Sequence, residues 1–461
     1  MDVKNLKVTV IGLGNSGVNA ALLLKEHGAS VRATDAGDSP ELTKTKIDLE
    51  AKRIEVETGR HTEGFVKGSD LVVVSPGIES SSQAMKWAAR HKIPIIGEME
   101  LGYRFCKGKI IAITGTNGKS TVTTLVGEIL KAGGKDTVVC GNIGNSLCGE
   151  IGGIKDHTWV VLEVSSAQLE RIERFKPHVA IILNVTDDHM DRYKNFYEYF
   201  NWKLKIFAHQ DKNDILILNY DAANLRSLKG LARSRVLFYA KEKATTGGYD
   251  ITAYTKGTKI CSSYGGKEKE IISFNEMKLK GVHNIENVLA SSLAAAVAGV
   301  GEEAVRKTVA GFKGLEHRFE TVDTIEGVEY IDDSKGTTVD STVRALESCD
   351  RPVILIAGGK DKHSDYTLAR EIIKKRVKYL IVIGEAKGPI RKAMHGAVET
   401  HDAKDMADAV ELARKLARKD WIVLLSPMCS SFDMYKNYKE RGRIFKEAVV
   451  GLTGSRHAVK T

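Results

Sequence analysis

The sequence predicts an α/β protein with three domains, each built around a mostly parallel sheet. Short runs rich in Val and Ile alternate with segments of helical periodicity along almost the whole chain, as in βαβ units. Several of these runs end in glycine-rich or polar motifs, where ligands usually bind in such sheets. The chain has 461 residues, which is more than one hydrophobic core of ~250–300 residues can organise.

Strands are expected where apolar, β-branched residues cluster. The expected strands are Lys7–Ile11, Leu71–Ser75, Ile110–Thr114, Val160–Glu163, Val179–Asn184, Ile215–Asn219, Val353–Ala357, Tyr379–Ile383 and Ile422–Ser426. The stretch Lys241–Lys280 alternates Gly, Thr, Tyr and Ser without a helical period, which predicts a small antiparallel β insertion. Glycine-containing connectors at Gly97–Gly102 and Gly311–His317 predict domains at residues 1–99, 100–314 and 315–461.

The composition excludes several classes of protein. With 42% hydrophobic and 28% charged residues, the chain is typical of globular proteins. No apolar run reaches the ~18 residues of a membrane span, and no charged leader precedes a long apolar stretch, so we expect a cytoplasmic protein without a membrane partner. The six cysteines lie far apart, which predicts reduced, mostly buried thiols. The net charge of +10 is spread among acids, which favours small anionic substrates over nucleic acid.

The strongest motif is a glycine-rich loop between an expected strand and a helix expected at Val122–Lys131. The loop consists of Gly115, Thr116, Asn117, Gly118, Lys119, Ser120 and Thr121. Its backbone N–H groups can surround a phosphate, Lys119 can reach the outer phosphates, and Ser120 can face magnesium. The strict phosphate-loop pattern would have glycine in place of Ile113, so the strand–loop–helix context carries the prediction of ATP binding. The alternative is a glycine-rich turn with an exposed lysine.

A second glycine pattern follows the first expected strand. It reads Gly12-Leu13-Gly14-Asn15-Ser16-Gly17, and Asp35 ends the next run 18 residues after Gly17. This spacing is similar to a dinucleotide fingerprint. The residues alone leave three interpretations open: NAD binding, binding of another nucleotide's diphosphate, or tight helix–strand packing.

Polar residues downstream suggest metal chemistry near the phosphate loop. Glu163 ends an apolar strand, His189 lies in a polar segment, and Lys203 lies in a helix expected at Phe196–His209. A carboxylate and an imidazole at strand ends suit magnesium chemistry, although a lone histidine is more often a hydrogen-bonded loop residue.

Further polar motifs follow the later strands. They are His317–Glu320, Asp332–Thr338, Gly358–Lys362 and Ser426–Asp433. Arg318 and Lys335 can clamp a phosphate or a carboxylate, with solvated loops as the alternative.

Taken in order, these motifs resemble the Mur ligase family over nearly the whole chain. The motifs that carry the resemblance are Gly115–Thr121, Gly141–Gly144, Glu163–Ser166, Asn184–Tyr193, His283-Asn284, His317–Glu320 and Asp333–Lys335. This family activates a carboxylate with ATP and couples it to an amino acid of the peptidoglycan peptide. The resemblance implies a Rossmann-like N-terminal domain, a central P-loop-type ATPase domain and a Rossmann-like C-terminal domain.

The resemblance is greatest to the members that add D-glutamate to UDP-N-acetylmuramoyl-L-alanine. The additional motifs are Gly12–Gly17, Ser75–Ile78, Asp188–Tyr193, Ser426–Asp433, Tyr435, Asn437 and Arg441-Gly442. The Asn-Pro-Arg motif expected of members that add a dibasic amino acid is absent. The resemblance implies these two substrates, ATP, two Mg²⁺ ions and a monomer.

The resemblance also implies roles for individual residues. Those implied for the UDP substrate are Gly14, Asn15, Ser16, Asp35, Gly77 and Asn142. Those implied for ATP are the residues of the glycine-rich loop with Asn284, Arg318 and Asp333. Those implied for the metals are Ser120, Glu163, His189 and a carbamylated Lys203, with Lys119, His189 and Lys203 as catalytic residues. Those implied for D-glutamate are Lys335, Thr337, Lys362, Ser431 and Phe432.

Carbamylation suits Lys203 because added CO₂ converts a cation into an oxygen ligand for magnesium. Ala36-Gly37 follow Asp35 where related enzymes can offer side-chain donors to uracil.

Three other functions are the alternatives. A folylpolyglutamate-type ligase would not need the Gly12–Gly17 domain, an NAD-dependent oxidoreductase would not use the loop at Gly115–Thr121, and a non-catalytic ATP-binding module would not need Glu163, His189 and Lys203 together.

Overall fold

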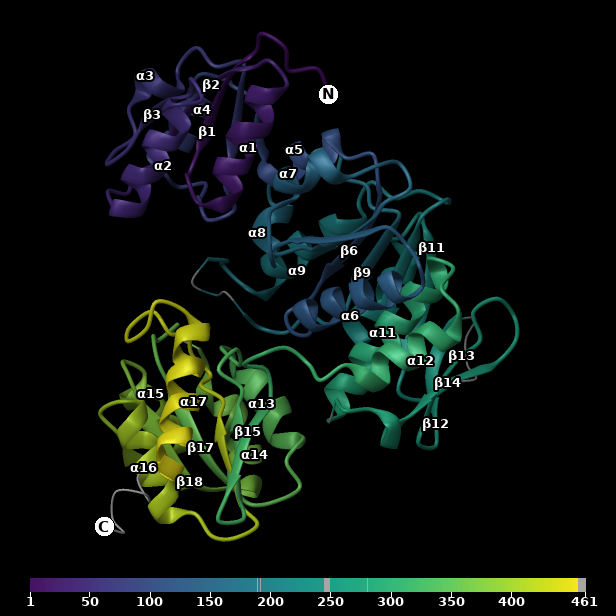
Figure 1. Cartoon of the computed structure of the whole chain (residues 1–461), viewed down its shortest axis with the longest axis vertical. Coiled ribbons are helices and arrows are strands. Elements are labelled where there is room, and N and C mark those ends of the chain that lie inside the picture. The colour runs from purple at the N-terminus through teal and green to yellow at the C-terminus, as the bar shows by residue number, and fades with distance from the viewer. Residues whose placement is uncertain (189, 191, 244–248, 280, 363, 455–461) are drawn as a thin grey trace. The chain divides into compact units, whose positions relative to one another are not determined.

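A computed structural model of the chain describes residues 1–188, 190, 192–243, 249–279, 281–362 and 364–454. It contains three sheets with helices between the strands, which confirms the α/β class (Figure 1). Contacts divide the chain into two compact units. The first unit holds the N-terminal and central sheets, and the second holds the C-terminal sheet with residues 186–199 and 275–286.

The N-terminal sheet has five parallel strands in the order β3-β2-β1-β4-β5. The strands are β1 (Lys7–Ile11), β2 (Ser30–Thr34), β3 (Glu55–Glu57), β4 (Leu71–Val74) and β5 (Ile95–Gly97). The helices are α1 (Asn15–Glu26), α2 (Pro40–Glu50), α3 (Glu63–Val66) and α4 (Gln83–Arg90). The strand order reverses at β1, so the glycine pattern after β1 lies where open α/β sheets bind ligands.

The central sheet has nine strands in the order β14-β13-β12-β11-β10-β9-β6-β8-β7. The strands are β6 (Lys109–Thr114), β7 (Thr137–Gly141), β8 (Trp159–Glu163), β9 (Val179–Ile182), β10 (Ile215–Asn219), β11 (Arg235–Ala240), β12 (Ile251–Lys256), β13 (Lys259–Ser262) and β14 (Lys269–Ser273). The helices are α5 (Glu98–Phe105), α6 (Lys119–Ala132), α7 (Leu147–Glu150), α8 (Ser166–Leu169), α9 (Phe196–Leu204), α10 (Ala223–Arg226), α11 (Val282–Val297) and α12 (Glu302–Gly311). This sheet also has a reversal, because β6 lies between β8 and β9.

The predicted antiparallel insertion is present at β12, β13 and β14, which pair antiparallel. It is a continuation of the central sheet, because β12 also pairs in parallel with β11. The helix expected at Val122–Lys131 lies within α6. The helix expected at Phe196–His209 is shorter: α9 ends at Leu204 and the 3-10 helix η2 (Lys205–Phe207) follows.

The C-terminal sheet has six strands in the order β15-β16-β20-β17-β18-β19. The strands are β15 (Glu320–Ile325), β16 (Val328–Asp332), β17 (Val353–Gly358), β18 (Val377–Ile383), β19 (Glu399–Asp402) and β20 (Ile422–Leu425). Apolar residues of α13 (Val339–Glu347), α14 (Arg370–Arg376) and α15 (Lys387–Met394) pack on one face of the sheet. Those of α16 (Met406–Leu416) and α17 (Tyr438–Gly454) pack on the other face.

Two further findings concern the described part of the chain. Five of the cysteines are buried, Cys106 is partly exposed, and all six are free thiols, which confirms the predicted burial. None of the described helices combines the length and the apolar character needed to cross a membrane.

Candidate active site

The glycine-rich loop, residues 115–121, follows β6 at the carboxyl edge of the central sheet. Gly118 caps α6 with a φ of 84°, and a Cβ there would lie 2.5 Å from Asn287 Oδ1. Only glycine suits this backbone and this space. Lys119 Nζ donates to the carbonyl oxygens of Gly115 and Thr116, both at 2.8 Å. The lysine therefore curls over the loop, as a phosphate-binding lysine would.

Asn184, which lies shortly after β9, forms hydrogen bonds with this loop. Its Oδ1 accepts from the backbone N of Asn117 at 2.8 Å, and its Nδ2 donates to Asn117 O at 3.1 Å. The backbone N of Thr116 also donates to Asn184 O at 2.9 Å. The sequence motif predicted no separate role for Asn184, but these three bonds fix the path of the loop.

Two charged side chains are buried beside the loop. Lys203, on α9, is 1% exposed, and its Nζ donates to Gly115 O at 3.0 Å. Glu163, at the end of β8, is 2% exposed, and its Oε1 accepts from Asn142 Nδ2 at 2.9 Å. The structure thus brings Lys203 to the loop and pairs Glu163 with Asn142.

The donor set at this edge suits a hard cation. The Ser120 hydroxyl is buried in the first turn of α6, and Glu163 supplies a buried carboxylate at the end of β8. Oxygen ligands of this kind are those that Mg²⁺ prefers. Two further metal ligands were predicted: Lys203 is buried beside the loop, and His189 lies outside the described residues.

The glycine pattern Gly12–Gly17 forms a tight turn between β1 and α1. A Cβ on Gly17 would lie 1.8 Å from Gly12 O, so the helix packs closely against the strand end. Asp35 closes the turn, because its Oδ2 accepts from Leu13 N at 2.6 Å and its Oδ1 accepts from Gly37 N at 2.8 Å. Tight packing, one of the three interpretations of the pattern, is therefore real.

The same edge also offers backbone to a ligand. Gly14 caps α1, and a Cβ on Gly14 or on Gly77 would meet nothing within 4 Å. Asn15 and Ser16 begin α1, whose N-terminus favours a negative charge. The open space and the helix terminus suit a diphosphate.

Asn145, in the loop between β7 and α7, joins the two sheets of the first unit. Its Oδ1 accepts from Asn19 Nδ2 at 2.7 Å and from Asn15 Nδ2 at 3.3 Å. The same loop begins with Asn142, which bonds Glu163. Hydrogen bonds thus run from the start of α1 to the loop that carries Asn142.

Asp333, which follows β16, is a buried carboxyl group in the second unit. Its Oδ1 accepts from Phe319 N at 3.2 Å and its Oδ2 accepts from Ser426 Oγ at 2.8 Å. Burial raises its pKa to about 7, against the lowering effects of Ser426 and Arg318. Lys335 Nζ lies 5.2 Å from the ring centroid of Tyr438, and Thr337 N donates to Lys335 O at 2.8 Å.

Arg441, on α17, connects three loops of the second unit. It is fully buried, and it donates to Ser334 Oγ at 3.0 Å, Ser334 O at 2.8 Å and Cys429 O at 3.1 Å. It also reaches Ser430 O at 3.3 Å and Gly358 O at 3.5 Å. Desolvation lowers its pKa to about 10. One guanidinium group therefore joins the loops that carry Lys335, Lys362 and Ser431.

The predicted D-glutamate contacts on these loops differ in exposure. Ser431 is 2% exposed, whereas Phe432 is 72% exposed. Lys362 Nζ lies 3.9 Å from Asp188 Oδ1, a neighbour of the predicted metal ligand in sequence. The apolar ring of Phe432 is therefore available to a ligand.

A cavity of about 820 Å³ in the second unit is lined by Asn284 and Arg318, two of the predicted ATP contacts. Leu279, Phe319 and Ile331 add apolar walls. Mixed apolar and polar cavities of this size accept drug-sized ligands. A nucleoside fits this description.

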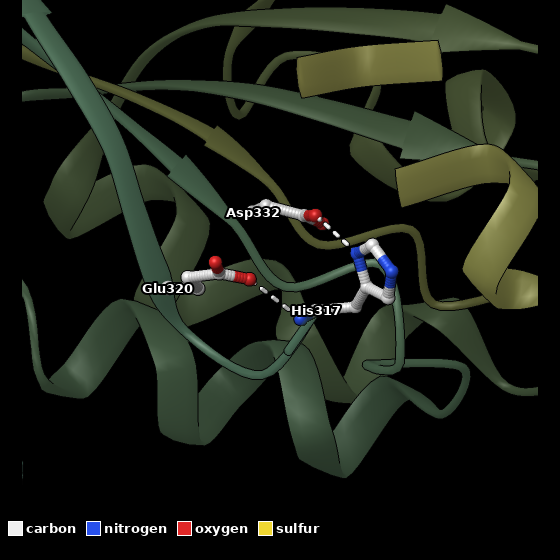
Figure 2. A group of neighbouring side chains, drawn as sticks. All are labelled: His317, Glu320 and Asp332. Atoms are coloured by element: carbon white, nitrogen blue, oxygen red, sulfur yellow. Dashed lines mark hydrogen bonds and ion pairs between the residues drawn. The ribbon is translucent and has the colours of Figure 1, made fainter. Parts of the chain in front are cut away.

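His317, Glu320 and Asp332 form a cluster whose ligand atoms lie within 4.8 Å of one another (Figure 2). His317 Nδ1 lies 2.7 Å from Asp332 Oδ2, and His317 N donates to Glu320 Oε2 at 2.8 Å. Glu320 Oε1 accepts from Lys446 at 2.7 Å. Lys335 N donates to His317 O at 3.0 Å, and His317 directly precedes Arg318. The cluster therefore connects the backbone beside Arg318 with the backbone at Lys335.

Three family models match the chain. The MurD-like N-terminal domain of Mur ligases matches residues 6–97, the Mur ligase middle domain matches residues 113–295, and the Mur ligase glutamate ligase domain matches residues 317–429.

Curated relatives match nearly the full length. A UDP-N-acetylmuramoylalanine--D-glutamate ligase of Koribacter versatilis is 43% identical over 97% of this chain and 98% of the relative. The ligase of the same name from Geotalea daltonii is 41% identical over 98% of this chain and 99% of the relative.

Solved structures share the fold at low identity. A pseudomurein peptide ligase type C from Methanothermus fervidus aligns with a TM-score of 0.61 and 19% identity, over 96% of this chain and 100% of that one. A MurF ligase from Thermotoga maritima in complex with ADP aligns with a TM-score of 0.60 and 15% identity, over 97% of this chain and 98% of that one. The chain belongs to the Mur ligase family.

Proposed function

We propose that this protein joins D-glutamate to the L-alanine carboxylate of UDP-N-acetylmuramoyl-L-alanine and converts ATP to ADP and phosphate. The relatives that share 41–43% of its residues over nearly full length are named for this ligation. The structural observation that carries the proposal is the phosphate loop, where Lys119 curls over Gly115 and Gly118 caps α6. The reaction belongs to peptidoglycan precursor synthesis.

In the first step, a carboxylate oxygen of the UDP substrate attacks the γ-phosphorus, and the bond to the ADP oxygen breaks. The products are ADP and an acyl phosphate. Lys119 and the backbone N–H groups of residues 115–121 stabilise the charge on the transferred group. In the second step, the D-glutamate amine attacks the acyl carbon, the tetrahedral intermediate expels phosphate, and the amine loses a proton to leave an amide. Positioning and charge stabilisation are the main tasks of the protein.

Two Mg²⁺ ions would be held by Ser120, Glu163, His189 and Lys203, the lysine as its carbamate. They would supply positive charge at the phosphate oxygens. The buried hydroxyl of Ser120 and the buried carboxylate of Glu163 support this assignment. Asn142 orients the Glu163 carboxylate through their 2.9 Å bond.

The remaining residues divide between nucleotide and amino-acid binding. Asn284, Arg318 and Asp333 would contact ATP, supported by the cavity that Asn284 and Arg318 line. The UDP part would bind at Gly14, Asn15, Ser16, Asp35 and Gly77, with Asn142 on the same substrate. D-Glutamate would bind at Lys335, Thr337, Lys362, Ser431 and Phe432, on the loops that Arg441 joins.

Residues 1–99 would bind the UDP substrate, residues 100–314 would bind ATP, and residues 315–461 would bind the amino acid. We place the protein in the cytoplasm, with small molecules and no nucleic acid or membrane as partners, and its monomeric state stays a prediction.

Membership of the Mur ligase family disfavours the alternative of an NAD-dependent oxidoreductase. A folylpolyglutamate-type ligase is disfavoured by the match of residues 6–97 to a MurD-like domain.

The test is phosphate release from ATP and magnesium with UDP-N-acetylmuramoyl-L-alanine, comparing D-glutamate with L-glutamate, other amino acids and none. Release that requires both the UDP substrate and D-glutamate is the expected result. Release with a different amino acid would keep the family and replace the proposed substrate. No release with any combination would contradict the proposal.

A further inference from the structure

Tyr366 lies between two of the loops that carry the proposed D-glutamate contacts. It begins the 3-10 helix η5 (Tyr366–Ala369) and is 4% exposed. Its hydroxyl donates to Asp361 Oδ1 at 2.8 Å and lies 3.2 Å from Cys429 Sγ. Asp361 directly precedes Lys362, and Cys429 lies two residues before Ser431. Tyr366 thus contacts both loops next to their functional residues.

The direction of these bonds follows from the chemistry of the groups. A carboxylate only accepts, so the single proton of the Tyr366 hydroxyl goes to Asp361. The Cys429 thiol must then donate to the Tyr366 oxygen. Burial raises the pKa of Cys429 to about 11 and also raises the pKa of Tyr366, so both groups keep their protons at neutral pH. The chain of bonds runs from Cys429 through Tyr366 to Asp361.

The backbone already joins the two loops on one side of Asp361. Lys360 N donates to Ser430 O at 2.9 Å. Gly359 has a φ of 136°, and a Cβ there would lie 2.2 Å from Ser430 O, so the loops are in close contact at that point. The Tyr366 bonds extend this connection to the residue beside Lys362.

We propose that Tyr366 is a positioning residue for the amino-acid substrate, because it sets the spacing between Lys362 and Ser431. The inference rests on the proposed function, since it takes these two residues as D-glutamate contacts. Tyr366 acts through Asp361 and Cys429 and does not itself touch the substrate. Without its hydroxyl, the two loops would keep their backbone connection at Lys360 and lose the one beside Lys362.

The test is Tyr366→Phe, which keeps the buried ring and removes the hydroxyl. We expect KM for D-glutamate to rise about tenfold, because a hydrogen bond to a charged group is lost, while KM for ATP and for the UDP substrate changes less than about twofold. Tyr379→Phe, in the same unit but packed against His401 and Trp421, is the matched control and should change none of the three. An unchanged KM for D-glutamate in Tyr366→Phe would overturn the proposal.

Two further measurements separate positioning from a general loss of structure. If Tyr366 acts through Asp361, then Tyr366→Phe combined with Asp361→Ala should raise KM for D-glutamate no more than Asp361→Ala alone, and additive effects would contradict this. Cys429 should also react faster with iodoacetamide in Tyr366→Phe, while the equally buried Cys349 should not. An unchanged labelling rate would overturn the proposal even if the wild type does not use D-glutamate, a result that would contradict the proposed function separately.

Discussion

Lys119 and Lys203 share one acceptor, the carbonyl oxygen of Gly115. Their Nζ atoms lie 2.8 and 3.0 Å from it. Two ammonium groups this close repel each other, and Lys203 is almost fully buried, which makes its charge costly. Carbamylation of Lys203 would replace its positive charge with a negative one and would keep one N–H for the Gly115 oxygen. This shared acceptor supports the proposed carbamylation of Lys203.

Lys203→Ala is expected to lower the rate of phosphate release about 100-fold or more, because the proposed anionic carbamate next to the phosphates cannot form. Acetate or formate should restore part of the rate by occupying the vacated space. Lys205→Ala, an exposed neighbour, is the control and should keep the wild-type rate. Full activity of Lys203→Ala without added carboxylate would contradict the role.

Gly118→Ala is expected to raise KM for ATP about tenfold. A side chain there would be strained at a φ of 84° and would contact Asn287 Oδ1 at 2.5 Å. Gly134→Ala is the control, because Gly134 has a φ of 73° but nothing within 4 Å of an added Cβ. It should lower stability by ~1 kcal/mol and leave KM for ATP unchanged. Equal effects of the two variants on KM would show that the loop does not bind ATP.

Arg441→Lys is expected to lower the free energy of unfolding by about 3 kcal/mol and to weaken D-glutamate binding. Lysine cannot reproduce the planar fork that reaches Ser334, Cys429 and Ser430, and it leaves buried carbonyl groups unpaired. Arg443→Lys alters an exposed pair with Glu447 and should change stability by less than about 0.5 kcal/mol. Urea denaturation and the D-glutamate dependence of the rate check both effects. Wild-type behaviour of Arg441→Lys would show that the Arg441 hydrogen bonds do not hold these loops together.

Asp333 should make stability depend on pH. Burial raises its pKa from 3.8 to about 7, so the native state binds more protons than the unfolded state between these values. Its contribution is complete below about pH 4 and is lost as the pH rises through about 7. Relative to Asp333→Asn, the wild type should lose up to about 1.4 kcal/mol of stability per pH unit in this window.

Urea denaturation from pH 4.5 to 8 checks the prediction for Asp333. The exposed Asp323→Asn variant is the control and should follow the wild type at each pH. A constant difference between the wild type and Asp333→Asn across the range would exclude a raised pKa.

Much of the fold could be predicted because the buried strands are short apolar runs. Each expected strand is present with its ends shifted by at most two residues, as for β18, which begins at Val377 where Tyr379 was expected. The strands that were not predicted are β2, β3, β5, β7, β11, β15, β16 and β19. In β2, the polar residues Ser30, Arg32 and Thr34 interrupt the apolar run, and β3 is very short. The insertion was predicted as antiparallel, but its parallel pairing with β11 depends on a distant strand that local pattern does not identify.

One part of the candidate site could also be predicted from the sequence, and another part could not. The loop of residues 115–121 could be predicted because its strand, glycines and helix are contiguous in sequence. The hydrogen bonds of Arg441 could not be predicted, because they join residues up to 107 positions apart. The contact of Tyr366 with Cys429 spans 63 positions and shows no local pattern. Such contacts depend on which loops meet at the carboxyl edge of a sheet.

The most direct test of the central claim, that a carboxylate is activated by phosphoryl transfer at this loop, is to follow the oxygen atoms. The alanine carboxylate of UDP-N-acetylmuramoyl-L-alanine is labelled with ¹⁸O, and the phosphate released with ATP and D-glutamate is analysed by mass spectrometry. An acyl phosphate predicts one ¹⁸O in each phosphate, because the oxygen that attacks the γ-phosphorus leaves with it. Unlabelled phosphate, released by attack of water on ATP, would contradict the account.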